Sequence, residues 1–202
     1  MSGTPLGLLD IFAVRHGETE WSKSGRHTGV TDIPLLPEGE ERARTLQPRL
    51  AGERFSRVYS SPLQRAMGTA QLAGFPEPIP EPLVVEWDYG DYDGITSRQI
   101  HQQRPEWDLW RDGCPNGESI AQVRARAARF LEKLAGLPEG SVIVFSHGHF
   151  LRVLALEFLG LPDGAGARLN LETAAVSVLR RADSGSLLQL WNDTGHLPGL
   201  PA

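Results

Sequence analysis

The chain has 202 residues, of which 40% are hydrophobic and 22% are charged, so it can bury one substantial core and is neither fibrous nor disordered in composition. A formal net charge of −5 disfavours a general polyanion binder, and we therefore expect no nucleic-acid partner. No apolar run approaches the roughly 20 residues that span a bilayer, and the N-terminal sequence lacks the basic flank and apolar core of a signal peptide. The single cysteine, Cys114, fits a reducing compartment. These features predict a cytoplasmic protein without membrane contact, formed by one domain over residues 1–202.

The first elements are a short strand and an amphipathic helix. Residues 8–14 are apolar and suit a buried strand that ends at Arg15-His16-Gly17. Residues 37–50 have the spacing of an amphipathic helix, which Pro48 should end or kink.

A second strand and helix follow. Residues 57–60 predict the strand, after which Ser61 can cap a helix and Pro62 can occupy its first position. This helix should run to about residue 73, with Arg65 in its first turn or so. Four prolines make residues 74–82 an extended connection, and a brief strand is expected over residues 83–86.

A long excursion without sustained periodicity separates the two halves of the chain. It covers residues 87–117, is rich in Trp, Tyr, Asp and Gly, and contains a short helical pattern at residues 97–103. Long excursions of this kind in a compact domain are usually functional loops. Ser119 and Gln122 then resemble a capping box at the start of the clearest helix, which continues to Leu134.

The last third of the chain predicts a strand, a core helix and a hairpin. Residues 142–145 form a buried-strand pattern that leads into Ser146-His147-Gly148, and residues 150–159 are apolar almost all round. Residues 174–180 and 187–191 predict two closing strands. Strands that alternate with helices predict an α/β fold, a three-layer α/β/α sandwich with a mostly parallel central sheet.

Two histidines follow buried strands and precede glycines. His16 and His147 should therefore emerge at C-terminal strand ends, where the ligand crevices of open α/β sheets lie. Arg15 adjoins the first histidine, and Arg65 lies near the start of a helix, whose N–H groups favour an anion. Two guanidinium groups and two imidazoles predict a phosphate cradle if the fold brings them together.

These residues resemble the histidine phosphatase superfamily, which includes phosphoglycerate mutases and many small phosphatases. The similarity begins at Arg15-His16-Gly17-Glu18-Thr19 and continues, in family order, through four more blocks: residues 60–66, 86–94, 117–119 and 146–148. It therefore spans almost the whole chain. Within the superfamily, residues 21–29, 86–90 and 110–114 are most similar to the branch of sedoheptulose-1,7-bisphosphatase and bacterial broad-specificity acid phosphatases, which is hydrolytic.

The resemblance implies a phosphomonoester hydrolase that forms a phosphohistidine on His16. Arg15, Arg65 and His147 would stabilise the charge of the transferring phosphoryl group. Glu86 would protonate the leaving alkoxide and then activate water. No metal or other cofactor is implied, because the arginines take the role that a divalent ion has elsewhere. The implied substrates are small phosphorylated metabolites, in particular sugar phosphates or bisphosphates.

Further residues are expected around this cradle. Ser22, Thr28 and the backbone of Gly29 should contact phosphate, and Arg26 and His27 are candidates for a second substrate phosphate. Tyr89, together with Trp21, Trp107 and Trp110, lines a substrate entrance or packs the loops.

The same residues allow other interpretations. A zinc site at His147-Gly148-His149 lacks a third ligand at a clear spacing, and Cys114 has no evident activating partner. A phosphoglycerate mutase would use the same nucleophile, but mutases usually have Asn at the position of Ser22. A non-catalytic binding module disagrees with the intact set of Arg15, His16, Arg65, Glu86 and His147. A homodimer, common among relatives, is compatible with the chain.

Overall fold

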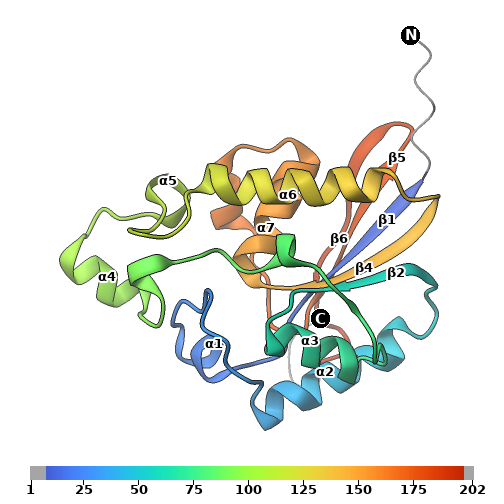
Figure 1. Cartoon of the computed structure of the whole chain (residues 1–202), viewed down its shortest axis with the longest axis horizontal. Coiled ribbons are helices and arrows are strands. Elements are labelled where there is room, and N and C mark those ends of the chain that lie inside the picture. Colours follow the sequence, from blue (N-terminus) through green and yellow to red (C-terminus); the bar gives the residue numbers. More distant parts are fainter. Residues whose placement is uncertain (1–7, 198–202) are drawn as a thin grey trace.

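One six-stranded sheet forms the centre of the protein (Figure 1). The computed structural model describes residues 8–197. The strand order is β3-β2-β4-β1-β5-β6, in which the first four strands are parallel and β5 pairs antiparallel with both of its neighbours, β1 and β6. The bounds are β1 Leu9–Arg15, β2 Phe55–Ser60, β3 Ile79–Pro80, β4 Gly140–Ser146, β5 Val176–Ala182 and β6 Gly185–Asp193. The expected mostly parallel α/β sheet is confirmed.

Helices cover both faces of this sheet. In Figure 1, α2 (Pro37–Leu50) and α3 (Gln64–Leu72) lie on one side, and α6 (Ile120–Ala135) and α7 (Gly148–Leu159) lie on the other. Side chains alternate along β1 between the two cores: Ile11 packs with the α6 and α7 residues, and Phe12 packs with the α2 and α3 residues. The three-layer arrangement is confirmed. None of the helices within residues 8–197 is long and apolar enough to cross a bilayer.

Shorter elements lie beyond one edge of the sheet. They are α1 (Glu20–Ser24), α4 (Ser97–Gln103) and α5 (Leu109–Asp112). The 3-10 turns within residues 8–197 are Pro82–Val84, which packs against α6, Gly90–Tyr92 and Asp163–Arg168. The predicted helix at 97–103 and the capping box of α6 are confirmed, since Ser119 and Gln122 bond each other's backbone N–H groups.

Prolines and a serine produce two departures from the predicted helices. Pro48 does not end α2, which continues to Leu50; it is exposed and lies in the last turn, where few hydrogen bonds remain to be lost. Ser61 and Pro62 do not open α3. This helix begins at Gln64, whose N–H donates to the Asp32 carboxylate at 2.8 Å.

The strand expected over residues 83–86 is wrong. Residues 82–84 form a 3-10 turn, and the chain then runs extended outside the sheet. The carbonyl of Val84 accepts a hydrogen bond from Ser146 Oγ at 2.6 Å, and the carbonyls of Leu83 and Val85 accept from Arg126. Side chains therefore provide the hydrogen bonds that a neighbouring strand would have provided.

The register of the parallel strands brings their C-terminal ends together. Arg15, the last residue of β1, pairs with Ser146, the last residue of β4, and Ser60 of β2 pairs with the adjacent Phe145. His16 and His147 therefore leave the sheet side by side. In Figure 1, α1, α4 and α5 lie beyond this same edge, on the left.

The C-terminal segment after β6 is tethered to the body of the protein. Asp193 forms an ion pair with Arg49 of α2 at 2.8 Å, and the Leu197 side chain is buried in the α2 side of the core. These contacts hold the end of β6 and the residues after it against the α2 side of the protein.

Candidate active site

His16 directly follows β1. Its imidazole is buried, and one ring nitrogen is engaged in a hydrogen bond. Its Nδ1 is 2.7 Å from the carbonyl oxygen of Gly17. A carbonyl can only accept, so Nδ1 carries the proton and Nε2 of the neutral ring keeps its lone pair. Burial, followed by the positive charges of Arg65 and Arg15, lowers the pKa of His16 well below its ordinary value. The ring is therefore neutral at physiological pH, and its Nε2 is unprotonated.

His147 lies directly beside His16, with ring centroids 5.1 Å apart. Arg65 Nε donates to its Nδ1 at 3.2 Å, so the proton of the neutral ring is on Nε2, which donates to Ser61 Oγ at 2.8 Å. Burial and the charge of Arg65 lower the pKa of His147 well below its ordinary value. The two neighbouring imidazoles are thus held in opposite tautomers.

Arg65 is fully buried at the start of α3 and is held by backbone carbonyls. Besides His147, its guanidinium donates to the carbonyls of Thr28, Gly29 and Thr31 at 2.9–3.1 Å. These bonds connect α3 to the loop that follows α1. The structure thus places Arg65 in contact with His147 and close enough to His16 for its charge to affect that ring.

A pocket of about 330 Å³ opens in front of His16. Eight of the predicted site residues line it: Arg15, His16, Ser22, Arg26, His27, Thr28, Glu86 and Tyr89. Arg65 and His147 belong to the layer beneath, and Gly29 does not line the pocket. The Gly29 N–H instead donates to Asp93 Oδ1 at 2.7 Å, so it is not directed at a substrate as expected.

Arg15 is a partly buried cation whose guanidinium is not fully hydrogen-bonded. One guanidinium nitrogen donates to the carbonyl of Leu171, whereas its buried Nε has no partner among the described residues. A buried donor without a partner is costly in a folded protein and is typical of a ligand site. Arg15 is accordingly placed to bind an anion in the pocket.

Glu86 reaches the pocket from the extended segment after Val84. Its Oε1 accepts from the N–H groups of Trp87 and Phe150 at 2.9 and 2.8 Å, and its Oε2 accepts from the N–H of His149 at 3.1 Å. The last two donors belong to the first turn of α7. The helix therefore fixes the direction of this carboxylate.

The remaining predicted residues have mixed surroundings. Ser22 Oγ accepts from the Thr19 N–H at 2.8 Å and completes the cap of α1 while it lines the pocket. Burial lowers the pKa of His27 to about 4, so this imidazole is uncharged at neutral pH. Tyr89 Oη lies 2.6 Å from His149 Nδ1, and burial raises the pKa of Tyr89 well above its ordinary value.

Arg152 and His149 also line the pocket, although sequence reasoning assigned no role to Arg152. Arg152 Nε is buried without a partner among the described residues, and its guanidinium lies over the ring of Trp110 at 5.7 Å. The available signal was its place as a lone arginine in the first turns of an otherwise apolar helix. Trp107 and Trp110 are buried beside the pocket, so of the two roles considered for them, packing the loops agrees with the structure.

The side chains give this pocket a positive field in an acidic protein. Arg15, Arg26 and Arg152 face one carboxylate, that of Glu86, and the imidazoles around them are neutral. Among residues 8–197, no cluster of three or more His, Cys, Asp or Glu side chains is arranged as a metal site. The arrangement can bind a small anion next to an unprotonated imidazole nitrogen.

Comparison with known proteins agrees with this geometry. Residues 11–194 match the family model of the histidine phosphatase superfamily, branch 1. The chain belongs to the histidine phosphatase superfamily. Within this superfamily, an acid phosphatase of Mycobacterium tuberculosis is 38% identical and aligns over 92% of this chain and 93% of its own.

Two further superfamily members are similar over most of this chain. A sedoheptulose 1,7-bisphosphatase of Saccharomyces cerevisiae is 36% identical over 73% of this chain and 66% of its own. A structure of a phosphoserine phosphatase mutant from Entamoeba histolytica with phosphoserine has a TM-score of 0.84, with 28% identity over 94% of this chain and 99% of that chain. Other relatives carry the name probable phosphoglycerate mutase.

Proposed function

We propose that this protein is a phosphomonoester hydrolase that acts on small phosphorylated metabolites, with His16 as the nucleophile. The observation that carries the proposal is the neutral His16 ring, whose Nδ1 is bonded to the Gly17 carbonyl, in a pocket lined by Arg15, whose Nε has no partner among the described residues. Its relatives named as phosphatases support the hydrolytic activity.

The reaction has two displacements at phosphorus. In the first, His16 Nε2 forms a bond to phosphorus while the ester P–O bond breaks, and the departing oxygen takes a proton from the Glu86 carboxyl group. In the second, Glu86 as a carboxylate takes a proton from water, the water oxygen bonds to phosphorus, and the N–P bond breaks. Inorganic phosphate and neutral His16 are the products.

Arg15, Arg65 and His147 stabilise the phosphoryl group in this proposal. Arg15 lines the pocket and would contact the phosphoryl oxygens directly. Arg65 and His147 hydrogen-bond each other behind His16, from where their positive field and fixed dipoles would act on the developing charge. Ser22, Thr28, Arg26, His27 and Tyr89 line the space left for the leaving group.

Sugar phosphates or bisphosphates are the substrates that we favour. The pocket has more cations than one phosphate requires, since Arg26 and Arg152 line it in addition to Arg15. Its lining is otherwise polar and rich in hydrogen-bonding groups, which suits a hydroxylated leaving group. The name of the yeast relative, a sugar bisphosphatase, supports the same class.

The alternative is a phosphoglycerate mutase, in which the phosphoryl group on His16 returns to the substrate instead of passing to water. The relatives named as probable mutases favour it. It is the weaker candidate, because the relatives with phosphatase names include the acid phosphatase at 38% identity.

Cys114 does not compete with His16 as a nucleophile. Burial, with a smaller contribution from Asp88, raises the pKa of its thiol to about 12, so the thiolate is rare at neutral pH.

A free buried thiol suits a cytoplasmic location, which we propose for this protein. We also propose a homodimeric state, which sedimentation velocity would test.

The first experiment measures phosphate release from a panel of sugar phosphates, 3-phosphoglycerate and p-nitrophenyl phosphate by the wild type and by His16→Ala. We expect release by the wild type and a loss of at least about 10³-fold in the variant, because the variant has no nucleophile. Quenching in alkaline denaturant, in which an N–P bond survives, should trap a phosphoenzyme on the wild type alone. Interconversion of phosphoglycerate isomers without phosphate release would support the mutase instead.

A further inference from the structure

The segment that carries Glu86 lies outside the sheet and has no strand to hold it. Residues 85–88 follow the 3-10 turn and run extended between α6 and the start of α7. Trp87 in the middle of this segment is completely buried. Its backbone therefore needs other partners to fix the position of Glu86.

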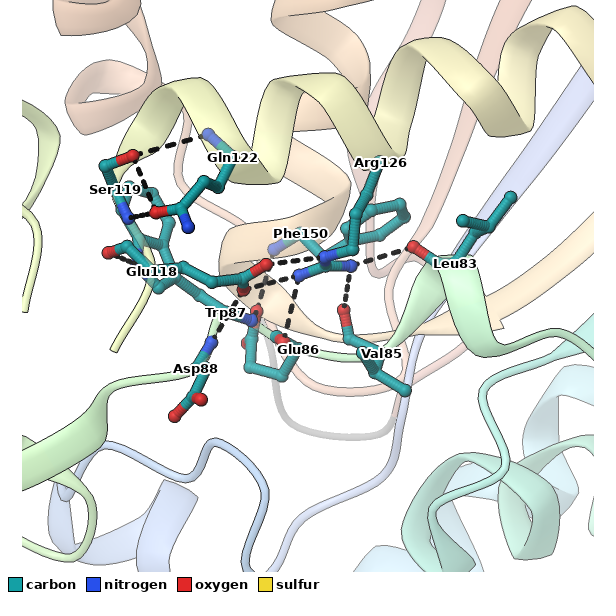
Figure 2. A network of polar contacts seen from close by, with 10 residues as sticks. All are labelled: Leu83, Val85, Glu86, Trp87, Asp88, Glu118, Ser119, Gln122, Arg126 and Phe150. Atoms are coloured by element: carbon teal, nitrogen blue, oxygen red, sulfur yellow. Dashed lines mark hydrogen bonds and ion pairs between the residues drawn. The ribbon is translucent and has the colours of Figure 1, made fainter. Parts of the chain in front are cut away.

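One guanidinium supplies most of these partners (Figure 2). Arg126 of α6 donates through Nη1 to the carbonyls of Leu83 and Val85 at 2.8 and 3.0 Å, and through Nη2 to the carbonyl of Glu86 at 3.2 Å. Three carbonyls of one short segment thus depend on a single side chain. Arg126 replaces the hydrogen-bond ladder of a neighbouring strand.

Glu118 fixes the orientation of this guanidinium and also forms hydrogen bonds with the same segment. Its two carboxylate oxygens accept from Arg126 Nε and Nη2 at 2.7 and 2.8 Å, a bidentate pair. Oε2 also accepts from the Asp88 N–H at 2.9 Å, and the Glu118 carbonyl accepts from the Trp87 indole at 2.8 Å. The pair therefore binds the backbone on both sides of Glu86.

The carboxyl end of Glu86 is held separately by α7. Phe150 connects the two supports, since its N–H donates to Glu86 Oε1 while its ring lies 5.2 Å from the Arg126 guanidinium carbon. Glu86 is thus anchored at its backbone by α6 and at its carboxylate by α7. A shift of the segment would move the carboxylate away from its donors and from the leaving group.

We propose that Arg126 and Glu118 are positioning residues that aim Glu86 at the leaving-group oxygen of the substrate. This inference rests on the proposed phosphatase function, in which Glu86 is the proton donor. Neither residue lines the pocket, so their action is exerted through the backbone of residues 83–88.

The dependence of kcat/KM on the leaving group distinguishes a positioning role from a purely structural one. An alkyl phosphate such as a sugar phosphate needs its leaving oxygen protonated, whereas p-nitrophenolate departs without a proton. Since kcat/KM reports the steps through release of the leaving group, its ratio for the two substrates isolates proton donation. The ratio is also independent of how much of the enzyme is folded, because both values come from one preparation.

The experiment measures this ratio for the wild type, Arg126→Met, Arg126→Lys, Glu118→Gln and, as a reference, Glu86→Gln. We expect Arg126→Met to lower kcat/KM for the best sugar phosphate by roughly 10–100-fold, part of the general-acid contribution, and to leave p-nitrophenyl phosphate within about threefold. The kcat/KM of Arg126→Lys for the sugar phosphate should lie between the values of the wild type and Arg126→Met, because an ammonium group keeps the charge but makes fewer of the directed hydrogen bonds.

Arg124 offers a matched control on the same helix. It is about as buried as Arg126 and binds Glu157, Asp163 and the Leu161 carbonyl, which lie away from Glu86. Arg124→Met should destabilise the protein comparably but leave the ratio of the two kcat/KM values at the wild-type level.

The two proposals fail in different ways. If the wild type is active and Arg126→Met lowers both substrates equally, Arg126 does not position the proton donor and the inference is overturned. If the wild type releases phosphate from no substrate, the proposed function itself is wrong and the inference falls with it.

Discussion

His16 owes its reactive form to one hydrogen bond and to its surroundings. The Gly17 carbonyl fixes the proton on Nδ1, and burial with two arginines opposes a second proton. We therefore predict that His16 stays neutral, with the proton on Nδ1, as the pH falls through 6.5, where a free imidazole is half protonated. Long-range proton–nitrogen correlation spectra of the imidazole rings would measure the tautomer and the protonation directly.

Assignment of these signals has a simple control. The His16 resonances are those absent from the spectrum of His16→Ala, and His147 should give the opposite tautomer because Arg65 donates to its Nδ1. A His16 ring that takes up a proton with a midpoint near 6.5 would contradict the prediction.

At the scale of the elements, a capping box stabilises the start of α6. This helix carries Arg126, the ion-pair partner of Glu118, and an apolar face that packs into the core. Ser119 Oγ accepts from the Gln122 N–H, and Gln122 Oε1 accepts from the Ser119 N–H at 2.8 Å. We predict that Ser119→Ala lowers the free energy of unfolding by about 1 kcal/mol, the usual value of such a cap. Urea titration measures the loss, and Ser184→Ala in the exposed turn before β6 is the control, expected to change stability by less than about 0.5 kcal/mol. Equal midpoints for Ser119→Ala and the wild type would refute this role of the cap.

The elements differ in how well the sequence predicts them, for physical reasons. The apolar runs of β1 and β4 and the spacing of α6 are local patterns with one solution each. Helices as short as α1 and α5 have too few residues to show a period. The segment at 83–86 has the composition of a strand, but its carbonyls accept hydrogen bonds from Arg126. This residue lies about 40 positions away in the sequence, so no local pattern predicts the contact.

The same distinction applies to the site. Arg15, His16 and His147 are predictable because each adjoins a strand whose C-terminal end must reach the ligand edge of the sheet. The position of Arg65 behind the histidines, the use of the Gly29 N–H by Asp93, and the presence of Arg152 in the pocket depend on tertiary packing. Sequence therefore predicted which residues gather at the pocket better than it predicted which of them line it and which lie beneath.

At the scale of the whole molecule, assembling the anion site requires several imidazoles to be buried without charge. Burial lowers the pKa of His16, His147 and His149 well below 6.5, and that of His27 to about 4. In the unfolded chain each of these rings binds a proton near 6.5. Below that pH the unfolded state holds more protons than the folded state, so acidification favours unfolding.

We therefore predict that the free energy of unfolding is highest above pH 6.5 and falls as the pH drops toward the folded-state pKa values of these histidines. Between pH 7.5 and 5.5 the loss should be roughly 1 kcal/mol for each of the four histidines, measured as the urea midpoint at constant ionic strength. The variant His27→Gln removes one of these groups and should reduce the slope by about a quarter. A midpoint that is unchanged or higher at pH 5.5 would mean that the four rings accept protons in the folded protein, and then the neutral nucleophile on which the proposed reaction depends would be lost as well.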